Sequence, residues 1–173
     1  MRKALYILAV VLCIPVLDSS CTKEDFCIND VVAYLNIGFY TWQNGERMTK
    51  TIKKFTANGI SSDSLIYNSK SNVKTIALPL SNRSDSSKFI FTFIVEIPAE
   101  NEEDPPVNQT FTDTIDFIYT RHMYLVSPLC GFAFNYNLLN SYSTHNYIDS
   151  VLIVNQHVII NPEEKVENIE ILF

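Results

Sequence analysis

The chain has 173 residues, of which 47% are hydrophobic and 18% are charged, and its formal net charge at pH 7 is −6. This length and composition predict a single globular domain and exclude a disordered chain. An acidic protein repels phosphate groups. The binding of nucleic acid and the electrostatic binding of anionic lipid headgroups are therefore excluded as well.

The N-terminal segment has the layout of a secretory signal. Arg2 and Lys3 precede an apolar stretch at positions 4–17, and two serines then lead to Cys21. The stretch is too short to span a bilayer, which needs roughly 20 apolar residues. It resembles a bacterial lipoprotein signal, in which Cys21 becomes the acylated first residue, although Asp18 stands where an aliphatic residue is usual. The alternative is ordinary cleavage nearby, which leaves a free thiol.

This resemblance implies three parts: a signal peptide at 1–20, an acylated cysteine and tether at 21–29, and one domain at 30–173. Removing the signal takes away two basic residues and one acidic residue, so the net charge becomes −7. The segment 22–26 resembles the export tag of Bacteroidota surface lipoproteins, and the other interpretation is a plain solvated tether. The expected location is the outer membrane, with the domain at the cell surface or otherwise facing the periplasm.

Two further cysteines, Cys27 and Cys130, remain in the expected mature chain. An envelope compartment is oxidising, so we expect them to form a disulfide. Closing a loop of roughly 100 residues in this way stabilises a fold by about 4–5 kcal/mol. A Cys/His metal site is the alternative, but the sequence lacks the close ligand spacing that such sites show.

Alternation of apolar and polar residues predicts β-strands along the whole domain. The clearest run is 31–42, with a turn at Asn44-Gly45 behind it, and 89–97 is apolar on both faces and therefore central in a sheet. The segment 48–55 is expected to be one edge or bulged strand, and Asn58-Gly59 a second turn. The pattern favours an antiparallel β-sandwich of immunoglobulin-like, two-sheet architecture with about nine strands, or alternatively a closed barrel.

Several short motifs, in their order along the chain, resemble a family of small Bacteroidota lipoproteins whose domain has no known function. The resemblance implies a secreted, lipid-anchored β domain without an assigned activity. The acidic, proline-rich loop at 98–109 is longer than the usual hairpin of that family. The motifs are Cys27, 63–68, 76–81, 112–115, 130–132 and 148–151.

Tyr34, Tyr40 and Trp42 share one face of the first predicted strand, with Gly38 between them. Exposed, they would form an aromatic platform able to stack on sugars or on an apolar partner surface. Covered by another element, they would simply belong to the core.

Three triplets resemble the Bacteroidota O-glycosylation pattern of Asp, then Ser or Thr, then an aliphatic residue. They place the candidate acceptors at Ser64, Thr114 and Ser150. The alternative is ordinary turn chemistry, since Asp and Ser often end a turn just before a strand begins.

The sequence lacks a catalytic motif, a cofactor is not expected, and the acidic residues at 100–104 lack the spacing of a calcium loop. His122, His145 and His157 are far apart in the sequence. We therefore expect a non-enzymatic binding or accessory module, held at the membrane by the lipid on Cys21, with an outer-membrane protein or a glycan as its partner. The alternatives are a hydrolase assembled from scattered Asp, His and Ser, and a structural adhesin or filament component.

Overall fold

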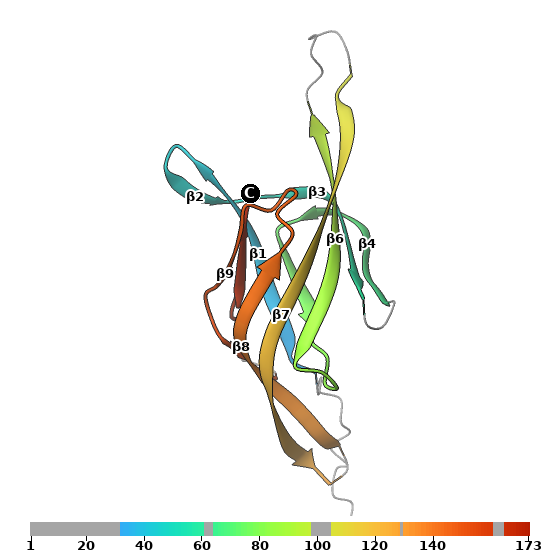
Figure 1. Cartoon of the computed structure of the whole chain (residues 1–173), viewed down its shortest axis with the longest axis vertical. Coiled ribbons are helices and arrows are strands. Elements are labelled where there is room, and N and C mark those ends of the chain that lie inside the picture. Colours follow the sequence, from blue (N-terminus) through green and yellow to red (C-terminus); the bar gives the residue numbers. More distant parts are fainter. Residues whose placement is uncertain (1–31, 61–63, 98–104, 129, 161–164) are drawn as a thin grey trace, which may run out of the picture.

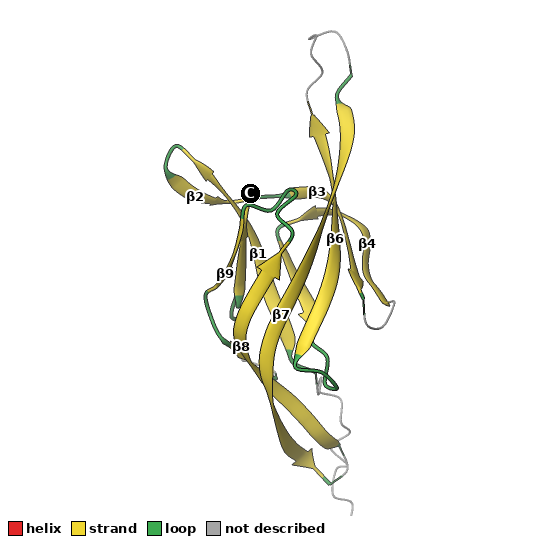
Figure 2. Cartoon of the chain, in the orientation of Figure 1, coloured by secondary structure: helices red, strands yellow, loops and turns green. Residues whose placement is uncertain are grey.

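The computed structural model describes residues 32–60, 64–97, 105–128, 130–160 and 165–173. Within these ranges the secondary structure consists of strands (Figure 2). No helix long and apolar enough to cross a membrane is found among them. The strands are β1 (Tyr34–Gln43), β2 (Glu46–Thr49), β3 (Ile52–Gly59), β4 (Ser64–Val73), β5 (Thr75–Pro79), β6 (Ser86–Ile97), β7 (Val107–Ser127), β8 (Gly131–Ser143), β9 (Ser150–Ile153), β10 (His157–Val158) and β11 (Ile169–Leu172).

The first sheet has five strands in the order β2-β1-β11-β9, with β5 also paired to β1. One edge of β1 is shared by two partners, since its first half pairs with β5 and its last four residues pair with β2. The other edge pairs in parallel with β11, which ends one residue before the last residue of the chain.

The second sheet has six strands in the order β10-β8-β7-β6-β3-β4, and all of its pairs are antiparallel. Strand β6 lies between β7 and β3, which confirms the central position predicted for 89–97. The two sheets make a β-sandwich, as predicted, with eleven strands instead of about nine.

The core lies between the sheets and is rich in phenylalanine. Leu35, Ile37 and Phe39 point inward from β1, as the alternation predicts, and all three are fully buried. The Phe39 ring meets Phe55 of the opposite sheet at a centroid distance of 5.4 Å. Edge-to-face and tilted contacts of this kind add about 0.5–1.5 kcal/mol to the burial of each pair.

The segment 48–55 differs from its prediction because it crosses from one sheet to the other. Strand β2 ends at Thr49 in the first sheet, and β3 begins at Ile52 in the second. Strand β3 is also not an edge, since β6 and β4 flank it, but its register with β4 shifts between Phe55 and Asn58, in line with the alternative of a bulged strand. The turn expected at Asn58-Gly59 is wrong as well, because both residues are paired within β3. The Asn44-Gly45 turn is confirmed, with positive φ angles of 53° and 79°.

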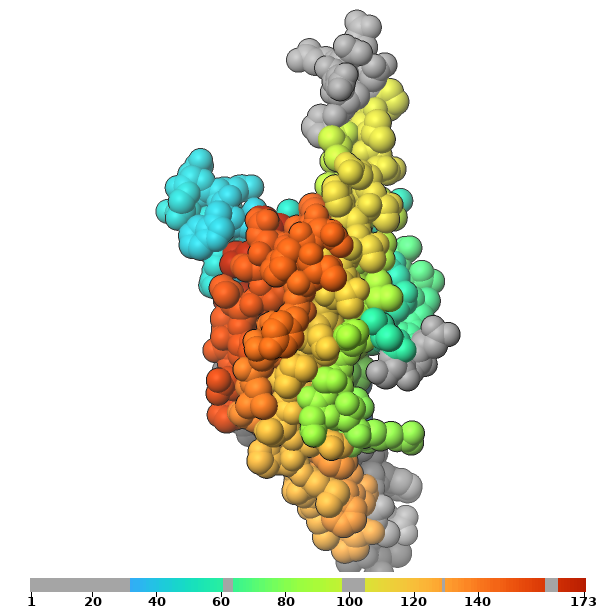
Figure 3. Space-filling view, in the orientation of Figure 1, coloured from blue at the N-terminus to red at the C-terminus, as the bar shows by residue number. Residues whose placement is uncertain are grey.

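Strand β7 is far longer than expected. The segments 114–119 and 122–126 belong to one strand of 21 residues, which pairs with β6 up to Ile118 and with β8 as far as Ser127. The molecule is elongated as a result: the far end of the β7–β8 pair extends below the body, the β6–β7 pair extends above it, and the β1–β2 hairpin projects to the upper left (Figures 1 and 3).

A buried carboxylate fixes the loop between β8 and β9. Asp113 of β7 is fully buried, and its carboxylate accepts four hydrogen bonds of 2.6–3.1 Å from the Thr144 hydroxyl and from three consecutive backbone N–H groups at 146–148. Burial alone would raise the pKa of Asp113, but these hydrogen bonds outweigh it and hold the pKa below its usual value. Asp113 thus supplies four of the hydrogen bonds that attach the loop to β7, and Thr144 and Asn146 add hydrogen bonds to the backbone of Thr114 and Thr112.

Replacing Asp113 with alanine is expected to lower the free energy of unfolding by about 3 kcal/mol, because three backbone N–H groups lose their acceptor. Since the folded-state pKa is depressed, the stability contributed by Asp113 is present above the ordinary pKa of 3.8 and is lost as the pH falls below it. Urea unfolding from pH 2 to pH 7 measures both effects. Asp116→Ala, on the same strand and in an ion pair with Lys88 at 3.5 Å, is the matched control and should cost less than about 1 kcal/mol.

Candidate binding site

The outer face of β1 is open to solvent at both ends. Tyr34 is 40% exposed and Trp42 is 60% exposed, while Tyr40 is half-buried. The outer face of β1 is therefore not buried under another element as part of the core. The three rings also do not form one continuous platform, because Tyr34 and Tyr40 are six residues apart, or about 20 Å along a strand. Tyr40 and Trp42 share the end of β1 that pairs with β2.

Tyr40 is the centre of a polar cluster on this face. Its hydroxyl donates to the carboxylate of Glu167, with oxygen distances of 3.0 and 3.1 Å. The guanidinium carbon of Arg47 lies 4.7 Å from the centroid of the Tyr40 ring. A cation over an aromatic face is attracted to it by about 0.5–1 kcal/mol at an exposed site. The Tyr40 ring is thus held at its hydroxyl group by Glu167 and over its face by Arg47.

Arg47 also forms an ion pair with Glu170, whose side chain is almost fully buried. The strand registers explain this meeting. Trp42 pairs with Arg47 across the β1–β2 hairpin, and Gly38 pairs with Glu170 across the parallel β1–β11 edge. Residues that pair directly share a face of the sheet. We call Tyr40, Arg47, Glu167 and Glu170 the Tyr40 cluster.

Gly38 makes room for the Tyr40 cluster. A Cβ atom at this position would overlap the Glu167 carboxylate and lie 2.7 Å from Cε2 of Tyr40. The φ angle here is not positive, so the need for glycine is one of space and not of backbone conformation. The carboxylate lies directly over the backbone of β1.

The environment of the Tyr40 cluster shifts two pKa values upward. Burial raises the pKa of Glu167, and the negative charge of Glu170 adds to the effect, while the Tyr40 hydrogen bond and Arg47 oppose it. Burial also raises the pKa of Tyr40, and the hydrogen bond to Glu167 raises it further. Tyr40 thus stays a neutral donor, and Glu167 takes up a proton closer to neutral pH than an ordinary glutamate.

A cavity of about 300 Å³ lies beside Glu167, where β4 of one sheet faces β5 of the other. The Tyr67 hydroxyl spans this gap, since it donates to the Ala77 carbonyl at 3.1 Å and accepts from the Ala77 N–H at 3.0 Å. The Nζ atom of Lys70 is 5.2 Å from the centroid of the Tyr67 ring. The polar side chains that line the cavity are Asn36, Tyr67, Lys70, Thr75, Lys165 and Glu167.

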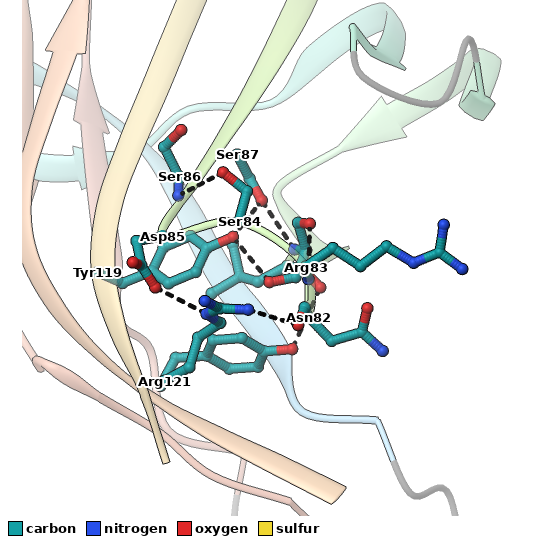
Figure 4. Close-up of polar contacts among 11 residues, drawn as sticks. Asn82, Arg83, Ser84, Asp85, Ser86, Ser87, Tyr119 and Arg121 are labelled. Carbon is teal, nitrogen blue, oxygen red and sulfur yellow. Dashed lines mark hydrogen bonds and ion pairs between the residues drawn. The ribbon is translucent and has the colours of Figure 1, made fainter. Parts of the chain in front are cut away.

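A second cluster of polar groups fixes the loop at 80–87, which connects β5 to the beginning of β6. The buried Tyr119 hydroxyl donates to the Ser81 carbonyl at 3.0 Å and lies 2.7 Å from the Ser87 hydroxyl (Figure 4). Arg121 reaches the same loop at Asp85 Oδ1 and the Asn82 carbonyl, at 2.7 and 2.6 Å. These bonds attach the loop to β7 and give it a structural role.

The loop at 80–87 also forms one wall of a larger cavity of about 590 Å³, whose opposite wall comes from β3 and β4. The Asn82 and Arg83 side chains point away from the hydroxyl cluster (Figure 4). They offer polar atoms to this cavity, but the Tyr40 cluster is the more strongly organised site.

The lipid and disulfide predictions concern residues at the N-terminus, and both Cys21 and Cys27 lie outside the described residues. Cys130 lies in the β7–β8 turn, where its N–H donates to the Ser127 hydroxyl at 3.0 Å. Val32 forms a parallel bridge with Phe134, which lies four residues after Cys130 in the sequence. The five residue steps from Val32 back to Cys27 allow a span of at most about 17 Å. The Cys27–Cys130 disulfide stays a prediction.

The three glycosylation candidates occupy different positions in the sheets. Ser64 and Ser150 begin β4 and β9, as the boundary interpretation expects. Thr114 does not, since it lies inside β7 and pairs with Ile90 of β6. The aspartate before it, Asp113, serves to hold the 144–148 loop, which explains that triplet without a sugar. Glycosylation of Ser64, Thr114 and Ser150 stays a prediction.

The three histidines are exposed, and the ring of His145 lies 3.0 Å from the Ile148 carbonyl through its Nδ1 atom. Within the described ranges no group of three or more His, Cys, Asp or Glu is placed to hold a metal ion. The acidic residues at 100–104 lie outside those ranges.

Two packed sheets with an organised polar cluster on one outer face define this chain as a β-sandwich protein. A family of unknown function, DUF6452, matches residues 54–173, and the chain belongs to it. The predicted membership of a family without known function is thereby confirmed, while lipid anchoring and a Bacteroidota source stay predictions. No curated protein and no solved structure matches the chain. Glu167 and Glu170 lie within the matched residues, and Tyr40, Trp42 and Arg47 precede them.

Gly38→Ala is expected to lower the free energy of unfolding by about 1–2 kcal/mol, because the new methyl group displaces Glu167 from Tyr40. In a Glu167→Ala background the same substitution should cost less, since the carboxylate is no longer in its way. Chemical unfolding of the four proteins of this double-mutant cycle gives the coupling directly. An equal cost in both backgrounds would show that Glu167 does not occupy the space above Gly38.

Proposed function

We propose that this protein is a non-enzymatic, lipid-anchored module of the outer membrane that binds a glycan on the outer face of β1. The observation that carries the proposal is the exposed Trp42 ring beside the Tyr40 cluster. Sugars present apolar C–H faces and a rim of hydroxyl groups, so a sugar-binding surface needs an aromatic ring and fixed polar groups together.

The polar groups of the site are suited to this task because they are already ordered without a ligand. Arg47 is held by Glu170 and Tyr40, and Glu167 is held by Tyr40. Binding then costs little side-chain entropy. The adjoining cavity adds Asn36, Lys70 and Lys165, so that donors and acceptors of both charges surround a small volume.

The position of the site fits a protein tethered at its N-terminus. The described chain begins at Val32, beside the β7–β8 pair, and β1 then leads away from that pair to the β1–β2 hairpin, which carries Trp42 (Figure 1). Ten residues of strand span about 33 Å. A tether before Val32 would therefore hold the Trp42 end away from the membrane surface.

Trp42 is the only tryptophan in the chain, so its fluorescence reports on the site without a label. The purified lipoprotein is expected to bind members of an immobilised glycan array, and titration with those glycans should change the tryptophan emission. Trp42→Ala should weaken array binding about fivefold or more, which corresponds to about 1 kcal/mol of lost stacking. Tyr142→Ala removes another highly exposed aromatic ring from β8 and is the matched control, with unchanged binding.

An array without any bound glycan, or equal binding by the Trp42→Ala variant, would contradict the glycan proposal. Mass spectrometry of the glycan after incubation separates binding from hydrolysis, since a shortened product would favour the hydrolase alternative.

The anchor is tested separately at Cys21. Cys21→Ser should move the protein from the membrane fraction to the soluble fraction and remove the mass of the acyl chains, because a bacterial lipoprotein carries its lipid on this residue. Several acyl chains bind a membrane far more firmly than one, each buried methylene adding about 0.8 kcal/mol. A Cys21→Ser protein that stays membrane-bound at unchanged mass would refute lipid anchoring.

A further inference from the structure

The far end of the β7–β8 pair is a two-stranded ribbon that extends beyond the sandwich. The pairing of β7 with β6 ends at Ile118, while its pairing with β8 continues to Ser127 (Figure 1). We call the described residues from Met123 to Phe134 the ribbon tip. A two-stranded ribbon on its own is at best marginally stable in water, so a surface that covers it would stabilise it.

The ribbon tip continues the core-facing side of the sheet where no opposing sheet covers it. Tyr119 and Leu138 pair with each other and are fully buried in the core. Farther along the same side, Met123, Leu125 and Phe132 are 60%, 54% and 61% exposed. On the other side, Tyr124 and Val126 are also exposed. Large apolar side chains therefore cover both sides of the ribbon tip.

The ribbon tip is also uncharged. No residue from Met123 to Phe134 carries a charged side chain. The nearest guanidinium, that of Arg121, is turned back to Asp85 and Asn82 of the sandwich loop (Figure 4). Exposed apolar patches of this kind mark sites that contact a membrane or a partner protein.

The course of the chain is the reason to favour a membrane as the surface that covers the tip. Val32 bridges Phe134, so the N-terminal segment leaves the described domain at the ribbon. The eleven residues from Val32 back to Cys21 can extend over at most about 36–40 Å. A lipid surface that holds Cys21 is thus within reach of the ribbon, on the side of the molecule opposite Trp42.

We propose that the ribbon tip inserts its apolar side chains into the lipid beside the anchor and forms a second membrane contact. This inference rests on the lipid anchor of the proposed function. The contact is apolar and not electrostatic, since the tip is uncharged and the protein as a whole is acidic. Two contacts at one end restrain the tilt of the sandwich and direct Trp42 away from the bilayer.

The test places a tryptophan in the tip and asks whether lipid chains quench it. Full-length mature lipoprotein carrying Trp42→Phe and Leu125→Trp is reconstituted into phosphatidylethanolamine–phosphatidylglycerol vesicles with or without brominated acyl chains. Bromine quenches tryptophan only on contact within the apolar layer. Fluorescence of the tip reporter should fall at least twofold in brominated vesicles. Leu139→Trp in the same Trp42→Phe background is the matched control, because Leu139 is similarly exposed on β8, and it should not be quenched.

The native Trp42 of the unmodified protein should also stay unquenched, since it lies at the opposite end. An unquenched tip reporter in protein that co-floats with vesicles overturns the proposal while leaving the anchor intact. A quenched tip reporter in protein whose intact mass shows no acyl chains supports membrane contact by the ribbon and refutes the anchor instead. A tip emission that shifts to the blue with protein concentration, without quenching, assigns the tip to a second copy of the chain and overturns the lipid proposal.

Discussion

The parallel pairing of β1 with β11 is the interaction on which the rest of the structure depends. It joins the first and last described strands of the domain, and backbone N–H groups of Asn168 and Phe173 donate to carbonyls of Asn36 and Tyr40 at 2.9 and 3.1 Å. Parallel neighbours cannot be joined by a tight turn, so a long connection must separate β1 from β11, and this connection contains all the strands of the second sheet. The entropic cost of closing so long a loop grows only slowly with its length. Burial of the phenylalanine core can therefore offset this cost.

The same pairing builds the candidate site. It brings Glu167 and Glu170 to the outer face of β1, where Tyr40 and Arg47 can bind them. Without β11, Arg47 would be an ordinary surface arginine and Gly38 would have no reason to lack a side chain. The inner face of the same strand buries Phe39 against Phe55, so one strand serves the core with one set of alternate residues and the site with the other.

The elongated shape separates two kinds of surface. The β1–β2 hairpin, which carries Trp42 and Arg47, projects from the upper part of the body, while the uncharged ribbon of β7 and β8 extends below it, beside the start of the described chain (Figures 1 and 3). The length of β7 makes this possible, because one strand of 21 residues crosses the body of the sandwich and continues beyond it. A module that binds at one end and is held at the other needs such a division.

The sequence by itself determined the β-sandwich class, the inward set Leu35, Ile37 and Phe39, and the Asn44-Gly45 turn, because alternation and turn chemistry are local. Only the tertiary structure decided that β2 and β3 belong to different sheets, that Glu167 meets Tyr40, and that Met123 and Leu125 are exposed. The physical reason is that alternation has the same period whether or not an opposing sheet is present, and that strand partners more than a hundred residues apart leave no local signal.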